Sequence, residues 1–547
     1  MIMRTSLTST LNHLRQRISD ERGFTMLATL MIMVVTTVLV GALFLALNGD
    51  AKLSQHDLDS KRAYNAAEAG ANAYLYQLNQ NPNYWANCSN DDVSQTQVPG
   101  TSPPEYYSYK VIPANGYTTC TSNTIAAFID ETTGSLRMEF TGYSGNPSVQ
   151  RTIVAQYRKL TPLDFAWYTV YESVDSSIPG TPSSGCNIFY RAGRNSSCNI
   201  NWITGDTVNG PMYTQDQYLI DGSPTFGGSA SDKIESLAPA PSGSGSGNYI
   251  CSGDNCGGLS LVGTAVPNAP LVPLPSDNTQ LLTDATNYGQ TFTGTTKIYL
   301  NGTTATVWNC PTTTSSGCTT STSVDLTQYP LIYIENGAGC KLAQYSPSGT
   351  TYTTTSGGMP TGCAGDAYIY GNYTTPVTIA AANDIVIDGN VTTTESGGVP
   401  TGGATLGLVA NQYIRVMHGC TYSYSGNGTN VSSSTQGGDP ASFNTLDIDA
   451  AILTLDHSFI VDNYDCGSPL STLTVHGAIA QYYRGVVGTV GGSGDATTNA
   501  TGYLKSYNYD RRLAYLLPPY LFDISTGGWE VERETLCTAN GTGAAAC

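Results

Sequence analysis

The sequence predicts an α+β fold that is mostly β, with one long helix at the amino terminus. Three observations lead to this prediction. A long uncharged run lies near the amino terminus, short alternating runs follow it, and a strand-and-turn signature recurs over the rest of the chain. The predicted order is a transmembrane helix, a small antiparallel β head, and a large parallel β-solenoid. A β-sandwich is the alternative for the last part.

The uncharged run extends from Phe24 to Leu47. A run of this length without charge is typical of a membrane-spanning helix. It continues without proline into a polar, helix-favouring stretch, so we expect one helix over residues 24–79, about 84 Å long at 1.5 Å per residue. Four arginines in residues 1–22 outnumber Asp20 and Glu21, which predicts that the amino terminus stays in the cytoplasm.

The obvious cleavage signature lies before the apolar run, whereas a secretory signal peptide carries it afterwards. It consists of Gly23 followed by Phe24, Thr25, Met26 and Leu27. Cleavage at this place would remove residues 1–23 as a leader and keep the apolar helix on the mature chain.

These residues and the short basic leader resemble the type III signal of type IV pilins. Residues 60–74, which include Ala-Ala-Glu-Ala, are similar to the first helix of PilX-like minor pilins. The resemblance covers roughly the first 80 residues. It implies cleavage between Gly23 and Phe24 by a prepilin peptidase, methylation of the new amino terminus, and packing of the helix against other pilin subunits. It also implies a single-pass membrane protein that becomes extracellular in the pilus.

Position 28 departs from the pattern of the major pilins. Those proteins carry a glutamate five residues into the mature chain, and it pairs with the terminal amine of a neighbouring subunit; this chain has Ala28. A carboxylate within a bilayer is costly unless a partner charge meets it. Within the family its absence is associated with minor subunits at a tip or initiation complex, so a tip position is a hypothesis here.

Fourteen cysteines follow the membrane segment, an even number. In an exported chain this indicates disulfides rather than a cytosolic metal cluster, and no Cys-x-x-Cys pair is present. We expect neighbours to pair, and no metal site. The expected pairs are Cys88 with Cys120, Cys186 with Cys198, Cys251 with Cys256, Cys310 with Cys318, Cys340 with Cys363, Cys420 with Cys466, and Cys537 with Cys547.

The composition argues against a nucleic-acid-binding surface. The net charge is −18 and only 12% of residues are charged, whereas phosphate binding needs clustered Lys and Arg. Thr, Ser, Gly, Asn and Tyr dominate instead. This polar, uncharged surface suits contact with carbohydrate, a host cell or a solid surface, and it is also common in exported β proteins.

Residues 84–160 predict the small antiparallel head. Short runs of alternating polarity, separated by Gly and Asn, indicate strands with one buried face. They are residues 106–112, 125–129, 136–140 and 152–157.

Residues 199–500 predict the solenoid. An apolar-x-apolar segment closed by a polar residue and Gly recurs, as expected for stacked rungs with tight corners. The repeats are residues 218–222, 298–302, 385–389 and 473–477. Long polar insertions interrupt them at residues 311–322, 346–358 and 421–438, where binding function is often found. Residues 501–547 are aromatic and contain two adjacent prolines, which predicts a C-terminal cap or strap.

We expect no enzyme and no cofactor. Parallel β-helices also occur in polysaccharide lyases and hydrolases, which need paired carboxylates or a carboxylate with a basic partner. The best such cluster comprises Asp447, Asp449, Asp456, Asp462 and Asp465, with His418, His457 and His476 scattered nearby. A solvated strand face gives the same pattern, and no nucleophile or metal motif accompanies it.

The sequence therefore predicts a minor pilin that displays a β-rich ectodomain for attachment. Two alternatives remain open. One is a single-pass surface anchor that carries a polysaccharide-binding β-solenoid. The other is a polysaccharide-degrading enzyme.

Overall fold

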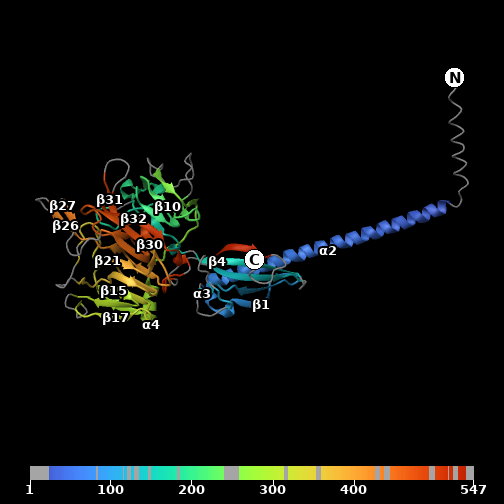
Figure 1. The fold of residues 1–547 in the computed structure, drawn as a ribbon, viewed down its shortest axis with the longest axis horizontal. Coiled ribbons are helices and arrows are strands. Elements are labelled where there is room, and N and C mark those ends of the chain that lie inside the picture. Colours follow the sequence, from blue (N-terminus) through green and yellow to red (C-terminus); the bar gives the residue numbers. More distant parts are fainter. Residues whose placement is uncertain are drawn as a thin grey trace, which may run out of the picture. The chain divides into compact units, whose positions relative to one another are not determined.

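The computed structural model of the chain forms two compact units (Figure 1). The first comprises residues 1–112, 137–156 and 531–547, and the second comprises residues 113–136 and 157–530. Within these limits the structure describes residues 24–81, 84–114, 116–119, 125–128, 135–145, 149–159, 161–181, 185–238, 258–312, 318–350, 352, 359–424, 431–436, 444–491, 499–514, 516–521 and 528–537.

The first unit is built on one helix, α2 (Phe24–Gln80), of 57 residues. Its carboxyl-terminal half buries one face, and the buried positions recur every three or four residues as a helix facing a sheet requires. They are Asp59, Ala63, Ala66, Ala67, Gly70, Ala71, Tyr74 and Leu78. The small residues among them allow the sheet to approach the helix backbone closely.

The small sheet has five strands in the order β1 (Asp92–Gln97), β2 (Tyr106–Val111), β3 (Leu136–Tyr143), β4 (Gln150–Lys159) and β33 (Trp529–Leu536). The pairs β1–β2 and β2–β3 are antiparallel. Burial alternates strictly along β3, because successive side chains point to opposite faces. The aromatic rings of Tyr74, Tyr109 and Phe140 pack together on the buried face.

The structure differs from the predicted head in two places. The run at residues 125–129 is not a strand; it contains the short helix α3 (Ile125–Phe128), since a brief apolar run fits either structure. The fifth strand, β33, comes from the segment expected to cap the solenoid. Alternating burial predicts a strand, but it does not predict which sheet the strand will join.

Replacing Gly142 with valine is expected to destabilise the small sheet by about 1–3 kcal/mol, the usual effect of overpacking. A Cβ atom at Gly142 would lie 1.9 Å from the carbonyl oxygen of Ala63 and 2.4 Å from the amide nitrogen of Ala67. Hydrogen exchange of peptides from β3 and from residues 63–78 should accelerate. Gly403→Val is the control, because its Cβ would meet nothing within 4 Å. Unchanged protection in G142V would contradict the close approach.

The second unit is a β-solenoid, as predicted, in which strands stack in parallel columns. The longest column runs β14 (Gln290–Thr293), β18 (Leu331–Glu335), β20 (Val377–Ala381), β24 (Leu406–Ala410), β28 (Leu446–Thr454), β30 (Pro469–Tyr483), β5 (Trp167–Tyr171), β8 (Met212–Thr214), β11 (Lys233–Ser236) and β13 (Thr264–Pro267). Every pair in this column is parallel, which excludes the β-sandwich.

Two further columns complete the rungs. The second contains β15 (Thr296–Gly302), β19 (Ala367–Tyr373), β21 (Ile385–Thr392), β25 (Ile414–Val416) and β29 (Phe459–Val461). The third runs from β28 and β30 to β32 (Asn499–Tyr509), β7 (Thr207–Asn209), β10 (Thr225–Phe226) and β12 (Ser260–Leu261).

A ladder of apolar side chains fills the interior. In the second column Ile298, Ile369, Ile387, Val416 and Val461 are stacked partners in register, and each is 0% exposed. Burying each such side chain contributes about 1.5–3 kcal/mol. At residues 298–302 and 385–389 the apolar-x-apolar signature is therefore the inward face of a rung. Residues 218–222 differ from the prediction, because β9 (Ile220–Asp221) pairs with β6 (Trp202–Ile203) in a separate two-stranded sheet.

The order of the rungs does not follow the sequence. The first strand of the unit, β5, begins at Trp167, ahead of the boundary expected at residue 199, and it pairs with β30 on one side and β8 on the other. The last strand, β32, pairs with β30 and β7. In Figure 1 the red-brown strands β30 and β32 accordingly lie between the yellow rungs around β15 and the green rungs around β10. The first and last strands meet in the middle of the stack.

Residues 268–289 connect the two ends of the longest column, from β13 to β14. The carbonyl of Val272 accepts a hydrogen bond from the Tyr168 hydroxyl at 2.7 Å, and Asn278 Nδ2 donates to the carbonyl of Ala381 at 2.9 Å. Helix α4 (Thr279–Tyr288) then buries Leu281 and Ala285 against the column. This return segment therefore runs along the solenoid and packs on it.

The segment predicted as a cap, residues 501–547, divides between the two units. Its first part completes β32, and β33 belongs to the small sheet. Between them, Pro519 accepts a hydrogen bond from Thr378 and Leu521 is buried in the same apolar cluster as the return segment. This middle part is a strap along the first column.

Four disulfides link neighbouring cysteines of the second unit: Cys186–Cys198, Cys310–Cys318, Cys340–Cys363 and Cys420–Cys466. These are four of the pairs expected from the sequence. Cys88 and Cys537 are also disulfide-bonded. Cys120, Cys251, Cys256 and Cys547 lie outside the described residues.

Candidate functional site

The amino-terminal half of α2 is the clearest functional element of the first unit. Among the described residues it contains one span, Met26–Phe44, that is long and apolar enough to cross a membrane, with a mean hydropathy of 2.5 and none of the span buried. Individual side chains such as Met26 are up to 74% exposed. A soluble protein rarely leaves so large an apolar surface uncovered.

The threonines of this span have their polar groups satisfied within the helix. The hydroxyl of Thr36 donates to the carbonyl of Ile32 at 2.8 Å, and that of Thr37 donates to the carbonyl of Met33 at 2.7 Å. In lipid every polar group must find a partner in the protein, and these two do. The span is therefore compatible with a bilayer along its whole length.

The predicted processing residues lie at the beginning of this helix. Gly23 lies outside the described residues, and α2 starts at Phe24. Thr25, Met26, Leu27 and Ala28 follow within the helix, and Ala28 is half-buried. Leu47 also lies within α2. No acidic residue occurs between Phe24 and Asp50, so the span offers no carboxylate to a neighbouring subunit.

In the second unit the predicted carboxylate cluster is distributed over separate networks. Asp462 accepts two hydrogen bonds at 3.0 Å from Arg415, which also donates to Asp384 at 2.9 Å. The hydroxyls of Tyr345 and Tyr352 both donate to Asp462 at 2.5 Å. These tyrosines lie on the insertion closed by Cys340–Cys363, so this buried network holds the insertion against the second column.

Asp449 belongs to a different network. His476 Nδ1 lies 3.2 Å from Asp449 Oδ1, and the amide of Thr393 donates to Oδ2. The hydrogen bond to Asp449 raises the pKa of His476. Glu395, Asp449 and His476 place ligand atoms within 4.8 Å of one another, which is compatible with a metal ion. Each oxygen of Asp449 also has one hydrogen-bond contact within the protein, to His476 or to Thr393.

The remaining members do not join these two groups into one site. Asp447 is half-buried on β28, Asp456 is exposed, and Asp465 accepts a hydrogen bond from Ser348. His418 is fully buried, and burial lowers its pKa. Within the described part of the chain, no catalytic pair of carboxylates forms from the predicted cluster.

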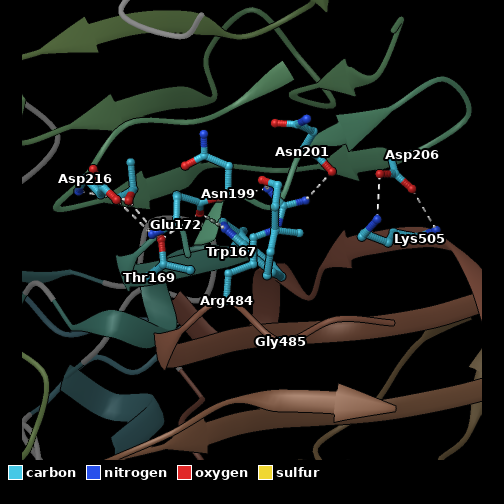
Figure 2. Close-up of polar contacts among 12 residues, drawn as sticks. Trp167, Thr169, Glu172, Asn199, Asn201, Asp206, Asp216, Arg484, Gly485 and Lys505 are labelled. Carbon is cyan, nitrogen blue, oxygen red and sulfur yellow. Dashed lines mark hydrogen bonds and ion pairs between the residues drawn. The ribbon is translucent and has the colours of Figure 1, made fainter. Parts of the chain in front are cut away.

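A network that the sequence did not reveal lies where the first strand of the solenoid meets the last ones (Figure 2). Arg484 Nη1 donates to Glu172 Oε2 at 2.9 Å, and both side chains are 0% exposed. The other oxygen of Glu172 accepts hydrogen bonds from Trp167 Nε1 and Thr169 Oγ1, both at 2.7 Å. The guanidinium of Arg484 lies 4.1 Å from the centre of the Trp202 ring.

The structure contains two more ion pairs here, and Figure 2 labels Asp206 and Lys505 of one and Asp216 of the other. Lys505 Nζ lies 2.7 Å from Asp206 Oδ2, and burial lowers the pKa of Lys505 although Asp206 opposes the shift. Arg194 donates to Asp216, whose pKa burial raises against the effect of that arginine. We call these three pairs together the seam network. Two of them join Arg484 and Lys505, near the end of the chain, to Glu172 and Asp206. The third is linked to them because Arg194 also donates to the carbonyl oxygen of Glu172 at 3.0 Å.

Comparisons with known proteins add little to this description. No family model matches the chain, and no curated protein matches its sequence. Among solved structures, the crystal structure of the competence-associated pilin ComZ from Thermus thermophilus aligns over 87% of this chain and 97% of that one. The identity is 14% and the TM-score is 0.28, which is too low to support a conclusion.

Proposed function

We propose that this chain is a PilX-like minor pilin of a type IV pilus or a related pseudopilus. The observation that carries the proposal is the division of α2. Its first half is exposed and apolar over Met26–Phe44, and its second half is buried against the five-stranded sheet. A helix that enters the membrane at one end and supports a small sheet at the other is what the resemblance of residues 23–74 to pilins implies.

The same arrangement supports assembly through the helix. Because the span is uncharged and its hydroxyl groups are satisfied, it can leave the bilayer and pack against equivalent helices of other pilin subunits without exposing unpaired charge. The second unit would then be displayed outside the cell, where its disulfides are stable. Its polar, tyrosine-rich surface suits attachment to a cell or solid surface.

A single-pass surface anchor with a ligand-binding solenoid is the second candidate. The same apolar helix supports it, because a permanent anchor needs the same length and composition. The two candidates differ in processing: a pilin loses residues 1–23 and is recovered in filaments, whereas an anchor keeps its leader and remains in the membrane.

Gly23→Glu is expected to abolish leader removal and incorporation into filaments, since a prepilin peptidase would cut after Gly23. Mass spectrometry of the amino-terminal peptide from sheared filaments and from membranes measures both effects. The unaltered chain should yield an N-methylated Phe24 in filaments. Gly403→Ala is the control, because its Cβ would meet nothing within 4 Å and it lies outside the helix that packs in the filament.

An intact leader on the unaltered chain, found only in membranes, would overturn the pilin proposal and leave the anchor. Equal recovery of G23E and the unaltered chain in filaments would show that assembly does not depend on this cleavage.

A further inference from the structure

A cleft of about 380 Å³ opens on the second unit. Four segments that are distant in sequence line it: the loop after β5, the return segment, the turn between β28 and β29, and the end of β30. The lining residues are Asp175, Ser176, Ser177, Leu274, Pro275, Ser276, Leu455, Asp456, His457, Tyr482 and Tyr483. The volume lies within the range of about 300–1,000 Å³ that is typical of small-molecule sites.

The imidazole of His457 is held in one orientation at this cleft. Its Nδ1 lies 2.5 Å from Asp175 Oδ2, and its ring stacks on Tyr413 with centroids 4.4 Å apart and an angle of 3°. The Tyr413 hydroxyl also donates to Asp175, at 2.8 Å. Because Nδ1 faces the carboxylate, the second ring nitrogen, Nε2, is the one available for a ligand.

Asp175 is fully engaged in holding this arrangement. Besides His457 and Tyr413, the amide and hydroxyl of Ser177 donate to its other oxygen at 2.8 and 2.7 Å. Burial alone would raise the pKa of Asp175, but these hydrogen bonds outweigh it and the pKa is lowered. Asp175 is therefore an ionised positioning group.

The end of β30 supplies an aromatic wall. The rings of Tyr482 and Tyr483 lie 5.0 Å apart, and both pack against Tyr171, at 5.6 and 5.4 Å. Phe189 stacks on the other side of Tyr171 at 4.9 Å. Tyr482 is only half-buried, so part of its ring is open to the cleft. An amphipathic ring in this setting can pack on the apolar face of a sugar and offer its hydroxyl.

The ionisable groups that line the cleft favour an uncharged ligand over an anionic one. Its ionisable lining groups are two aspartates, one histidine and two tyrosines, and no Lys or Arg is among the described residues that line it. Asp456 is exposed and accepts one hydrogen bond, from Gln412 at 3.2 Å, so its carboxylate can accept more. An anionic ligand would be repelled, whereas hydroxyl groups would find acceptors in Asp456 and His457.

We propose that this cleft binds a neutral glycan, with one sugar ring packed on Tyr482 and its hydroxyl groups bound by Asp456 and by Nε2 of His457. The proposed site names a class of ligand for the attachment role proposed above. The inference rests on that proposed function in one respect only, namely that the second unit is displayed outside the cell. Binding itself depends on the solenoid alone, so a failure of filament assembly would leave this inference standing.

The test uses the full-length chain in detergent and saturation-transfer NMR with calorimetry. The neutral probes are cellotetraose, maltotetraose, mannotetraose and chitotetraose, and the anionic probe is tetragalacturonate. At least one neutral probe is expected to bind, and tetragalacturonate is expected to bind at least tenfold more weakly. Tyr482→Ala and Asp456→Asn should each weaken that binding about tenfold or more. Tyr288→Ala removes a 62% exposed tyrosine outside the cleft and should leave it unchanged.

Because Asp456 is exposed, D456N should leave the fold unchanged. It therefore tests binding in the cleft even if Y482A perturbs the packing of the neighbouring tyrosines. The inference is overturned by no binding of any neutral probe at millimolar concentration. It is also overturned by preference for tetragalacturonate, or by binding that both cleft variants retain in full.

Discussion

Replacing Arg484 with alanine is expected to destabilise the solenoid by about 3–5 kcal/mol, the usual effect of leaving one partner of a buried ion pair without its counterion. Glu172 would then keep a fully buried carboxylate without its ion-pair partner. Arg484 also donates to the carbonyls of Ile200 and Asn201, at 3.0 and 3.2 Å, and these acceptors would lose their donor.

The position of Arg484 makes this effect global within the second unit. The strand that it follows, β30, pairs directly with β5 at the place where the first and last strands meet. Loss of the ion pair would weaken the contact between β5 and β30. The expected measurement is a lower midpoint of chemical denaturation, together with faster hydrogen exchange in peptides of β5 and β30.

Two further variants separate charge from packing. Lys61→Ala breaks an exposed ion pair with Asp57 on α2 and should change stability by less than about 1 kcal/mol. The double replacement Arg484→Met with Glu172→Gln removes both charges, and it should recover much of the stability that R484A loses. An R484A chain as stable as the K61A chain would refute this account of the seam network.

The stability of the first unit is expected to fall by about 4 kcal/mol as the pH rises from about 4 to above 7, through the carboxyl group of Asp91. Burial raises the pKa of Asp91 to about 7, although the hydrogen bond from the Tyr74 hydroxyl acts in the opposite direction. In the unfolded chain the pKa is about 3.9. The folded state therefore keeps a proton that the unfolded state releases in this range, and the stabilisation is lost as the pH passes 7.

The geometry agrees with a protonated Asp91. The residue is 0% exposed, and Oδ2 has no hydrogen-bond partner among the described residues. An ionised carboxylate in this position would have one oxygen desolvated and unpaired, which is costly.

Asp91→Asn should flatten this pH dependence and make the first unit more stable than the unaltered chain at pH 8. Hydrogen exchange of residues 84–97 at pH 5, 6, 7 and 8 would measure it in the disulfide-bonded chain. Asp57→Asn, at a carboxylate that is 64% exposed, is the matched control and should leave the profile unchanged. Equal pH profiles for D91N and the unaltered chain would exclude Asp91 as the group responsible.

The sequence predicted those features that depend on local pattern. The apolar run, the strands of β2, β3 and β4 and the inward residues of the rungs such as Ile298 and Ile387 could be recognised because burial imposes a period on neighbouring residues. Four described disulfides followed from proximity along the chain.

The features that the sequence did not predict depend on which distant segments pair. Arg484 and Glu172 are 312 positions apart, and nothing in either neighbourhood marks them as partners. The cleft draws on four separate segments, and His457 was interpreted as scattered because its partner Asp175 is 282 positions away. The order of the rungs depends in the same way on pairing between distant segments, such as β5 with β30.

The meeting of the first and last solenoid strands also determines where the molecule would carry mechanical tension. The chain leaves the small sheet after β4 and reaches β5 within residues 160–166, and Asp175 of the cleft follows soon after Tyr171. A pull on a ligand held by Tyr482 would thus enter the stack at the end of β30 and reach its neighbour β5, from which one of the covalent links to the first unit leaves. The seam network lies on this route, because it joins Arg484, the residue after β30, to Glu172, the residue after β5.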